Sequence, residues 1–131
     1  MIWNLLKKII TSSFVQNPLF NGHTRSLALI HAQLRMHCSN LMADLYKLHV
    51  VDSPQCSCMT GVEDNFHYFF KCPLYNLERI HLFNSIEPLC NISIDTLLFG
   101  NNLLSLDVNV QIFKSVERFI LETERFASIV K

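Results

Sequence analysis

Three cysteines and one histidine follow one another at a spacing that can bind a metal ion. Cys56, Cys58, His67 and Cys72 form the pattern C-x-C-x8-H-x4-C. Three thiolates and one imidazole make a complete tetrahedral set for Zn²⁺, and such a set leaves no position for a water molecule. A closed set of soft and borderline ligands is typical of a structural ion. The pattern therefore predicts one structural zinc ion per chain, bound by these four residues.

Two other interpretations of these residues stay open. Free cysteine is among the most buried residue types, and His67 lies in the aromatic run 66–70, so all four residues could belong to the ordinary core. A disulfide framework is the other alternative, but it is disfavoured because the chain has five cysteines, an odd number, and shows no secretion signal. The H-x4-C half matches the closing half of a retroviral-type zinc knuckle. The C-x-C half has one residue between its cysteines where such knuckles have two.

A short helix is predicted to carry the second pair of ligands. It would run from about residue 64 to residue 71, with His67 on it and Cys72 at its end, where Pro73 stops the helix. His67 and Cys72 are five residues apart, whereas an α-helix has 3.6 residues per turn. The two ligands can therefore share one face only if the helix unwinds before Cys72. The other two ligands would come from the preceding loop.

Composition predicts a small, mainly all-α domain. The chain has 131 residues, of which 50% are hydrophobic and 17% charged, which favours a folded globule over disorder. Three glycines and four prolines are few for a turn-rich β-sandwich. We expect an N-terminal amphipathic segment and linker at 1–22, and a helical domain at 23–131 that contains the motif at 56–72. No apolar run approaches the roughly 20 residues that span a bilayer, so no membrane partner is expected.

Capping residues and apolar periodicity predict the other helices. Thr24 and Ser39 can begin the first two, which would form an αα unit. A helix at 74–86 and a short one at 93–99, closed by Gly100, would follow. The longest helix is expected at about 107–130. Its apolar positions, which include Ile112, Val116, and Phe119 or Ile120, would face the core, and its charged residues, which include Glu117 and Arg125, would face solvent. The helix at 74–86 carries a mixed stripe of Leu74, Leu77, Ile80 or His81, and Phe83 or Asn84.

Charge is unevenly distributed, although the net charge is zero. Residues 1–50 carry five basic residues and one acidic residue, which leaves +4, whereas residues 51–131 carry six basic and ten acidic residues, which leaves −4. A basic half can meet phosphate, but neither half has a dense basic run, and a solvated surface accounts for most of these charges.

Four side chains are the predicted contacts to nucleic acid. Arg25 and Arg35 lie on the first helix and are the first candidates for phosphate contact, and Lys47 is a third basic candidate. Tyr68 lies beside the predicted metal ligands, where an exposed aromatic ring could stack on an unpaired base. The alternative is that the aromatic residues near the motif fill the small core beside the metal.

An ordered series of short segments along the chain is similar to a known family. The segments are Leu34-Arg35, Cys38-Ser39-Asn40-Leu41, Asp44-Leu45-Tyr46, Ser53-Pro54, Cys56-Ser57-Cys58, Glu63-Asp64, His67-Tyr68-Phe69-Phe70, Cys72-Pro73-Leu74-Tyr75, Asn109, Ile112-Phe113, Val116, Phe119-Ile120 and Arg125-Phe126. Together they resemble the C-terminal, zinc-knuckle-like region of non-LTR (LINE-type) retrotransposon reverse transcriptases. The resemblance covers about residues 22–127.

The resemblance implies a function as well as a ligand set. Cys56, Cys58, His67 and Cys72 correspond to the family's Cys-Cys-His-Cys set. The chain would be a tail that helps to bind template RNA or target DNA, with upstream reverse transcriptase domains as partners in a larger polyprotein. Nuclear and cytoplasmic localisation follows from the resemblance alone. Family members often have glycine directly after the second cysteine, whereas this chain has Met59 there.

The catalytic machinery of such a polymerase is not expected in this chain. A polymerase needs clustered aspartates for its two metal ions, but the aspartates here are scattered and no Asp-Asp pair occurs. Cysteine–histidine nucleophile pairs can be imagined, but nothing places a third, orienting group. We therefore expect a zinc-stabilised nucleic-acid-binding tail without enzymatic activity. The alternative is a structural or protein-interaction remnant that does not bind nucleic acid.

Overall fold

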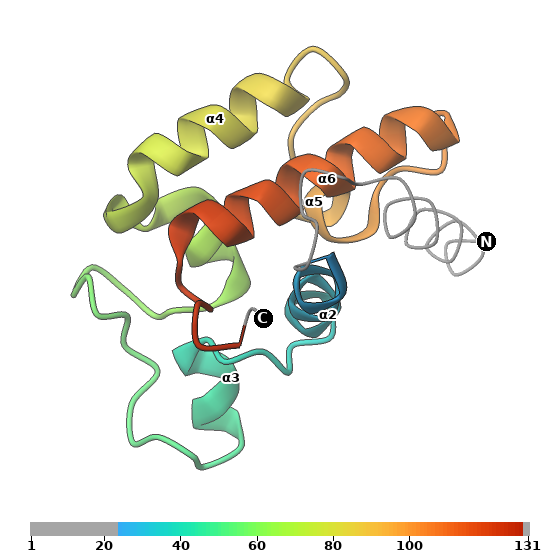
Figure 1. Cartoon of the computed structure of the whole chain (residues 1–131). Coiled ribbons are helices and arrows are strands. Elements are labelled where there is room, and N and C mark those ends of the chain that lie inside the picture. The colour runs from blue at the N-terminus through green and yellow to red at the C-terminus, as the bar shows by residue number, and fades with distance from the viewer. Residues whose placement is uncertain (1–23, 130–131) are drawn as a thin grey trace.

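Helices make up most of the regular structure in residues 24–129, the part of the chain that the computed structural model describes (Figure 1). Within these residues there is no β-strand, and the backbone bridge between Gln55 and Val62 is isolated. The segment predicted at 1–22 lies outside this range. The expected mainly all-α fold is confirmed. Its elements are α2 (Thr24–Arg35), α3 (Met42–Lys47), the π-helix η2 (His67–Lys71), the 3₁₀-helix η3 (Pro73–Tyr75), α4 (Asn76–Ile86), α5 (Ile94–Phe99) and α6 (Leu106–Thr123).

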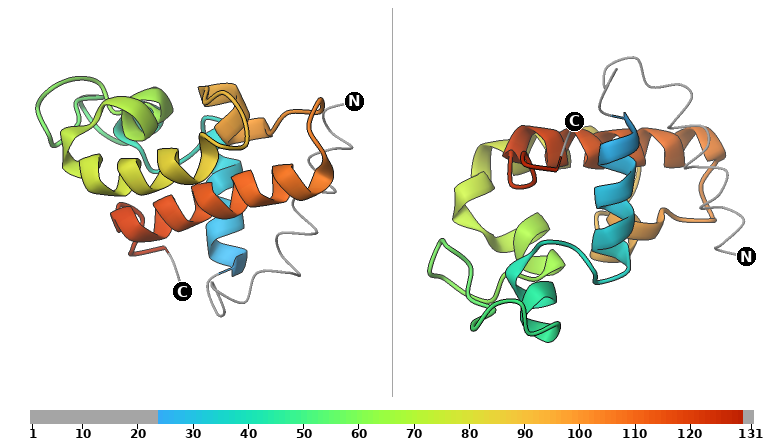
Figure 2. Two further views of the ribbon diagram at one scale, coloured as in Figure 1. Left: turned by 90° about the horizontal axis from the view of Figure 1, so that it is seen from above. Right: turned by 60° about the horizontal axis from the view of Figure 1, so that its bottom comes forward.

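The longest helix, α6, is the centre of the arrangement. Helix α4 lies beside α6, and α2 crosses α6 steeply (Figure 2). Helix α5 contacts both α2 and α6, so the main core lies where these helices meet. The loop and short helices that carry the predicted metal ligands lie near the C-terminal end of α6 (Figure 1). The core is apolar and includes Leu27, Ile30, Leu34, Leu97, Ile112, Phe113, Val116 and Phe119.

Serine caps define the starts of the last two helices. The Ser93 hydroxyl accepts a hydrogen bond from the Thr96 N–H, and the Ser105 hydroxyl accepts one from the Val108 N–H. Helix α5 ends at Gly100, whose φ of 73° is the left-handed conformation that glycine adopts without cost. The helix predicted at 107–130 ends earlier than expected, at Thr123, because the next residue has a left-handed φ of 56°. The chain beyond it turns back and buries Phe126.

The mixed stripe expected on α4 lies largely outside the core. Leu77 is 73% exposed, and Leu74 and Ile80 are exposed as well. The buried residues of α4 are instead Arg79, Leu82 and Ile86. Hydrophobic periodicity did not indicate the buried face of α4, because one of the residues on that face is the charged Arg79.

The turn between α2 and α3 differs from the prediction in its hydrogen bonds. Ser39 does not begin α3, which starts at Met42 after Leu41. The Ser39 hydroxyl donates to the Asp44 carboxylate (2.7 Å) and accepts from the Leu41 N–H (3.1 Å). Ser39 thus fixes the turn that leads into α3.

Among residues 24–129, no helix combines the length and apolar character needed to cross a membrane.

Candidate metal centre

The structure brings the four predicted ligands together. One ligand atom from each of Cys56, Cys58, His67 and Cys72 lies within 4.8 Å of the others. The Sγ atoms of Cys56 and Cys72 are 3.8 Å apart, and Cys58 Sγ is 3.3 Å from His67 Nε2. Tetrahedral zinc with bonds of about 2.3 Å to sulfur and about 2.0 Å to nitrogen requires separations of roughly 3.5–3.8 Å between ligand atoms. The Cys56–Cys72 and Cys58–His67 separations are within about 0.3 Å of this range, and none of the others exceeds 4.8 Å, so modest side-chain shifts would let the four atoms surround one metal ion.

A π-helical turn explains how two ligands five residues apart share one face. Residues 67–71 form η2, and the Cys72 N–H donates to the His67 carbonyl at 2.8 Å. This bond joins residues i and i+5, the π-helical pattern, which widens one turn enough to bring positions 67 and 72 together. The predicted unwinding of the helix is thus realised as a π turn and is followed by extended backbone at Cys72. Short π segments of this kind often occur at functional sites.

The first two ligands lie in a tight loop closed by backbone hydrogen bonds. The Glu63 N–H donates to the Pro54 carbonyl (2.9 Å), and the Cys56 N–H donates to the Gly61 carbonyl (2.9 Å). Inside the loop Met59 has a φ of 67°, in the left-handed region. Glycine would adopt this conformation more readily than methionine. The backbone at Met59 therefore favours glycine, the residue that often follows the second cysteine in the family that the sequence resembles.

The three clustered cysteines differ in the pKa of their thiols. Burial raises the pKa of Cys56 to about 12 and also raises the pKa of Cys72. Hydrogen bonds from Thr60, whose hydroxyl lies 3.0 Å from Cys58 Sγ, lower the pKa of Cys58 to about 6. Without a metal ion, neutral pH thus favours one thiolate beside two thiols. Because metal ions bind thiolates, binding here would release protons from the two buried thiols.

No family model, curated protein or solved structure matches this chain. The resemblance to the tail of non-LTR retrotransposon reverse transcriptases accordingly stays a prediction. All five cysteines lie within residues 24–129 and are free thiols, so the structure contains no disulfide there. Cys56 and Cys72 also contribute to the hydrophobic core, which places the ligand cluster at the edge of that core.

A partly buried ion pair between Arg125 and Glu63 lies next to the four clustered residues, and the sequence did not indicate it. The Arg125 side chain, which had been expected to face solvent, donates to both carboxylate oxygens of Glu63 (2.8 and 2.7 Å). The Met42 N–H donates to Glu63 as well (2.8 Å), and Glu63 Oε2 lies 3.9 Å from Cys56 Sγ. This pair links the metal-binding loop to the start of α3 and to the segment after α6. Glu63 and Arg125 are 62 residues apart, so no local sequence pattern indicates that they form a pair.

Two of the four side chains predicted to contact nucleic acid are buried in the structure. Arg35 is only 8% exposed, donates to the Leu98 carbonyl, and lies over the Phe113 ring. Tyr68 is fully buried, and its hydroxyl is 2.7 Å from the Thr123 hydroxyl. Neither side chain can reach a phosphate or a base without leaving the core. The sequence pattern could not reveal this, because both side chains are amphipathic and suit either environment.

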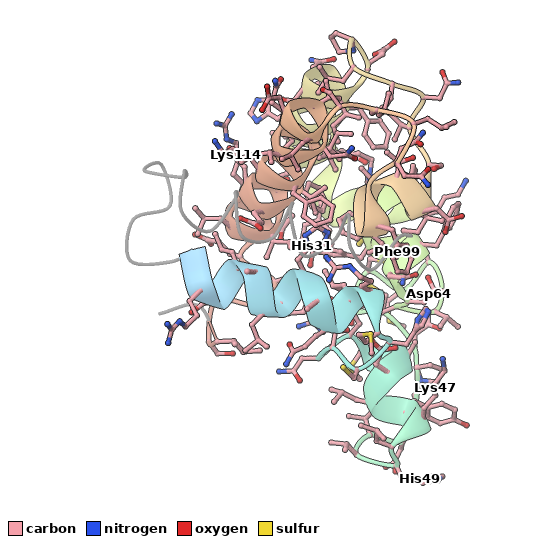
Figure 3. The ribbon with its side chains drawn as sticks, turned by 90° about the vertical axis from the view of Figure 1, so that its right-hand side faces the viewer. His31, Lys47, His49, Asp64, Phe99 and Lys114 are labelled. Carbon is pink, nitrogen blue, oxygen red and sulfur yellow. The ribbon has the colours of Figure 1, made fainter. Side chains whose placement is uncertain are left out.

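The other two predicted contacts, Arg25 and Lys47, are exposed. Figure 3 shows Lys47 on α3 and His49 just beyond it, at the end of the molecule away from α6. Phe66, directly before His67, is an exposed aromatic residue. Its ring is 44% exposed, and Lys71 Nζ lies 5.9 Å from the ring centroid.

Proposed function

We propose that Cys56, Cys58, His67 and Cys72 bind one structural zinc ion. The observation that carries this proposal is that four ligand atoms lie within 4.8 Å of one another. The donor set fits zinc because thiolates and imidazole are its preferred ligands, and four of them leave no open position for catalysis. The bound ion would supply a cross-link between the loop at 54–63 and the π-helix η2.

Cobalt substitution tests the ligand set directly. Tetrahedral Co²⁺ bound to thiolates has strong visible absorption, which aqueous Co²⁺ lacks. We expect saturation at one equivalent of Co²⁺ and displacement by Zn²⁺, with the spectrum changed in Cys58→Ser. The matched controls Cys38→Ser and Cys90→Ser should keep the wild-type spectrum, because those thiols lie outside the ligand cluster. A featureless titration, or an equal effect of the control variants, would refute the site.

We further infer that the zinc-bound chain is a nucleic-acid-binding tail of the reverse-transcriptase type, without the polymerase core. Its partners would be RNA or DNA, together with upstream domains of a parent polyprotein. Three features support this function: the resemblance, the ligand cluster, and the exposed pair of Phe66 and Lys71 on the ligand-bearing segment. A base can stack on the exposed ring while the ammonium group meets a phosphate. Lys47 and Arg25 offer further cationic contacts.

Salt-dependent titration tests nucleic-acid binding. The probe is a fluorescently labelled single-stranded oligonucleotide, as RNA and as DNA, titrated at several salt concentrations. The double variant Lys47→Ala, Lys71→Ala should bind more weakly, and the slope of log K against log salt should fall by about 0.7 for each phosphate that the variant no longer neutralises. The control is Arg118→Ala, which removes an exposed cation from α6. Salt-independent binding, or unchanged affinity in the double variant, would argue against this function.

A second candidate function, protein interaction, is favoured by one specific observation. Leu74, Leu77 and Ile80 are exposed near one another in sequence, and a groove of about 500 Å³ lies beside Ile80 and Phe83. Clustered exposed apolar side chains are typical of interaction surfaces. If the oligonucleotides do not bind even at low salt, and if Leu77→Ser with Ile80→Ser abolishes concentration-dependent self-association, this second function replaces the first.

A further inference from the structure

A buried arginine holds the backbone of the ligand-bearing turn. Arg79, on the inner face of α4, is only 8% exposed. Its Nη2 donates to the Cys72 carbonyl (2.7 Å) and lies 3.4 Å from the Tyr68 carbonyl, and its Nε donates to the Phe69 carbonyl (2.9 Å). Nη1 donates to the Asn76 side chain (2.8 Å). All three nitrogens of the guanidinium group are therefore hydrogen-bonded, and three of the four acceptors are carbonyls of the segment 68–72.

The local sequence explains why these carbonyls need such a partner. In a π-helix the carbonyl of Tyr68 would accept from the residue five positions later, which is Pro73 and has no N–H. Carbonyls at the end of a helix stay unpaired unless side chains or water satisfy them, and an unpaired buried carbonyl is costly. The planar guanidinium group, with five N–H donors in a fixed geometry, can bridge several of them at once.

The same contacts determine the relative positions of two metal ligands. The π turn joins His67 to Cys72 through one backbone hydrogen bond. Arg79 donates hydrogen bonds both to carbonyls between these two residues and to the Cys72 carbonyl itself. The positive charge of Arg79 would also oppose the net charge of the proposed zinc site. Three thiolates and a neutral histidine around Zn²⁺ leave a net charge of −1, and a guanidinium bonded to the backbone of a ligand residue partly offsets it.

We propose that Arg79 is a positioning residue of the metal centre, which maintains the π turn that brings His67 and Cys72 together. This inference rests on the proposed zinc binding. Groups that support metal ligands from outside the ligand set typically change metal affinity about 10- to 100-fold when removed. Arg79→Met should therefore weaken zinc binding by about 10- to 100-fold. Arg79→Lys, which keeps the charge but cannot bridge all the carbonyls, should weaken it by about 3- to 10-fold.

Arg35 provides a matched control. It is also 8% exposed, also donates to a backbone carbonyl, and lies over an aromatic ring, but its contacts are with Leu98 and Phe113 on other helices. Arg35→Met and Arg35→Lys should destabilise the fold without moving the zinc dissociation constant by more than about threefold. A purely structural role of Arg79 would make the two arginines behave alike.

The experiment compares the full chain with these four variants. The zinc dissociation constant is measured by competition with a chromophoric chelator, and Co²⁺ absorption reports the ligand geometry. If Arg79→Met does not fold, the comparison of Arg79→Lys with Arg35→Lys decides the matter. Weaker zinc binding and an altered Co²⁺ spectrum in the Arg79 variants alone would support the inference.

Two results would overturn this role, and they are distinguishable. If the wild-type chain binds zinc and the Arg79 variants match it in affinity and spectrum, only the inference about Arg79 fails. If the wild-type chain itself binds no zinc, the proposed zinc site fails, and the role of Arg79 fails with it.

Discussion

The region around the metal ligands and the region where α2, α5 and α6 meet are stabilised in different ways. In the helical region, long stretches of repeating backbone hydrogen bonds bring together apolar side chains such as Ile30, Leu34 and Phe113, all nearly inaccessible to solvent. In the metal-ligand region, residues 48–64 contain neither helix nor strand. Few repeating backbone bonds order that stretch, so its shape depends on links between distant residues.

Those links are the ligand cluster and three charged side chains. Arg79 holds the carbonyls at the end of η2, and the pair of Glu63 and Arg125 ties the loop to the segment after α6. The helical region has a buried polar group too, since His31 lies 2.8 Å from the Leu97 carbonyl, and Figure 3 shows it between α2 and α6. The difference is that repeating helical hydrogen bonds and apolar burial dominate the helical region, whereas the metal-ligand region depends on cross-links between distant residues.

The largest effect is expected when a ligand is removed. Cys72→Ser should abolish zinc binding and remove most of the zinc-dependent stability, about 5 kcal/mol or more, because metal binding to a structural site contributes directly to folding. The measurement is chemical denaturation with and without a chelator. Cys38→Ser, at an exposed cysteine, is the control and should retain the chelator effect. A Cys72→Ser protein that still gains stability from zinc would show that the two regions do not differ as described.

A core substitution in the helical region should have a smaller and metal-independent effect. Phe113 lies on α6 and is buried against α2, with its ring centroid 4.5 Å from that of His31. Phe113→Ala should lower the free energy of unfolding by about 3–5 kcal/mol, because apolar burial is reduced and a cavity is left behind. The decrease should be the same with zinc and with chelator. A decrease that vanishes on chelation would mean that the two regions are one coupled unit.

Acid should weaken the helical region through His31. Burial, together with the positive charge of Arg35, lowers the pKa of His31 from 6.5 to about 3 in the folded protein. Between these values the unfolded chain binds a proton that the folded protein does not, so stability falls as pH falls below 6.5. The slope from this group is up to about 1.4 kcal/mol per pH unit. His31→Leu should remove that slope.

Denaturation at pH 7, 6 and 5 measures the His31 contribution as the difference between wild type and variant. The metal ligands titrate in both proteins, so their share cancels. If the free energy of unfolding changed with pH in the same way in both proteins, His31 would not contribute to the pH dependence of stability.

The smallest effect is expected at Met59, and it should be stabilising. Its φ of 67° is unfavourable for a residue with a side chain, so Met59→Gly should raise the free energy of unfolding of the zinc-bound protein by about 0.5–1 kcal/mol. Met36 is also an exposed methionine but lacks a positive φ, and Met36→Gly should be destabilising. Thermal denaturation of the two variants beside wild type measures both effects. Equal destabilisation by both changes would show that the loop does not favour glycine.

Local sequence signals predicted the four residues that cluster and several helix boundaries. Cysteine and histidine at a short spacing have few structural roles, which is why the cluster of four could be predicted. Ser93 and Gly100 bracket α5 as expected, because capping depends on side chains close to the helix end. In the same way, Ile112 and Val116 lie on the buried face of α6.

Backbone demands and long-range pairs could not be predicted. Hydrophobic periodicity counts apolar side chains and ignores backbone carbonyls that need donors. It placed Leu77 in the stripe of α4, where the side chain is exposed, and could not indicate that Arg79 would be buried. Glu117, which was expected to face solvent, is buried as well. Partners far apart in sequence, such as Glu63 and Arg125, are set by the tertiary fold and are invisible to a local pattern.

The central claim, that the Cys-Cys-His-Cys cluster is a structural zinc site, is tested most directly by one measurement. It is the zinc content of the purified protein, with the far-UV helix signal recorded before and after chelation and after zinc is returned. We predict one zinc ion per chain, loss of helix signal on chelation, and recovery with zinc. A zinc-free protein whose helix signal does not respond to chelator or to added zinc would contradict the account, and the four residues would then be ordinary core.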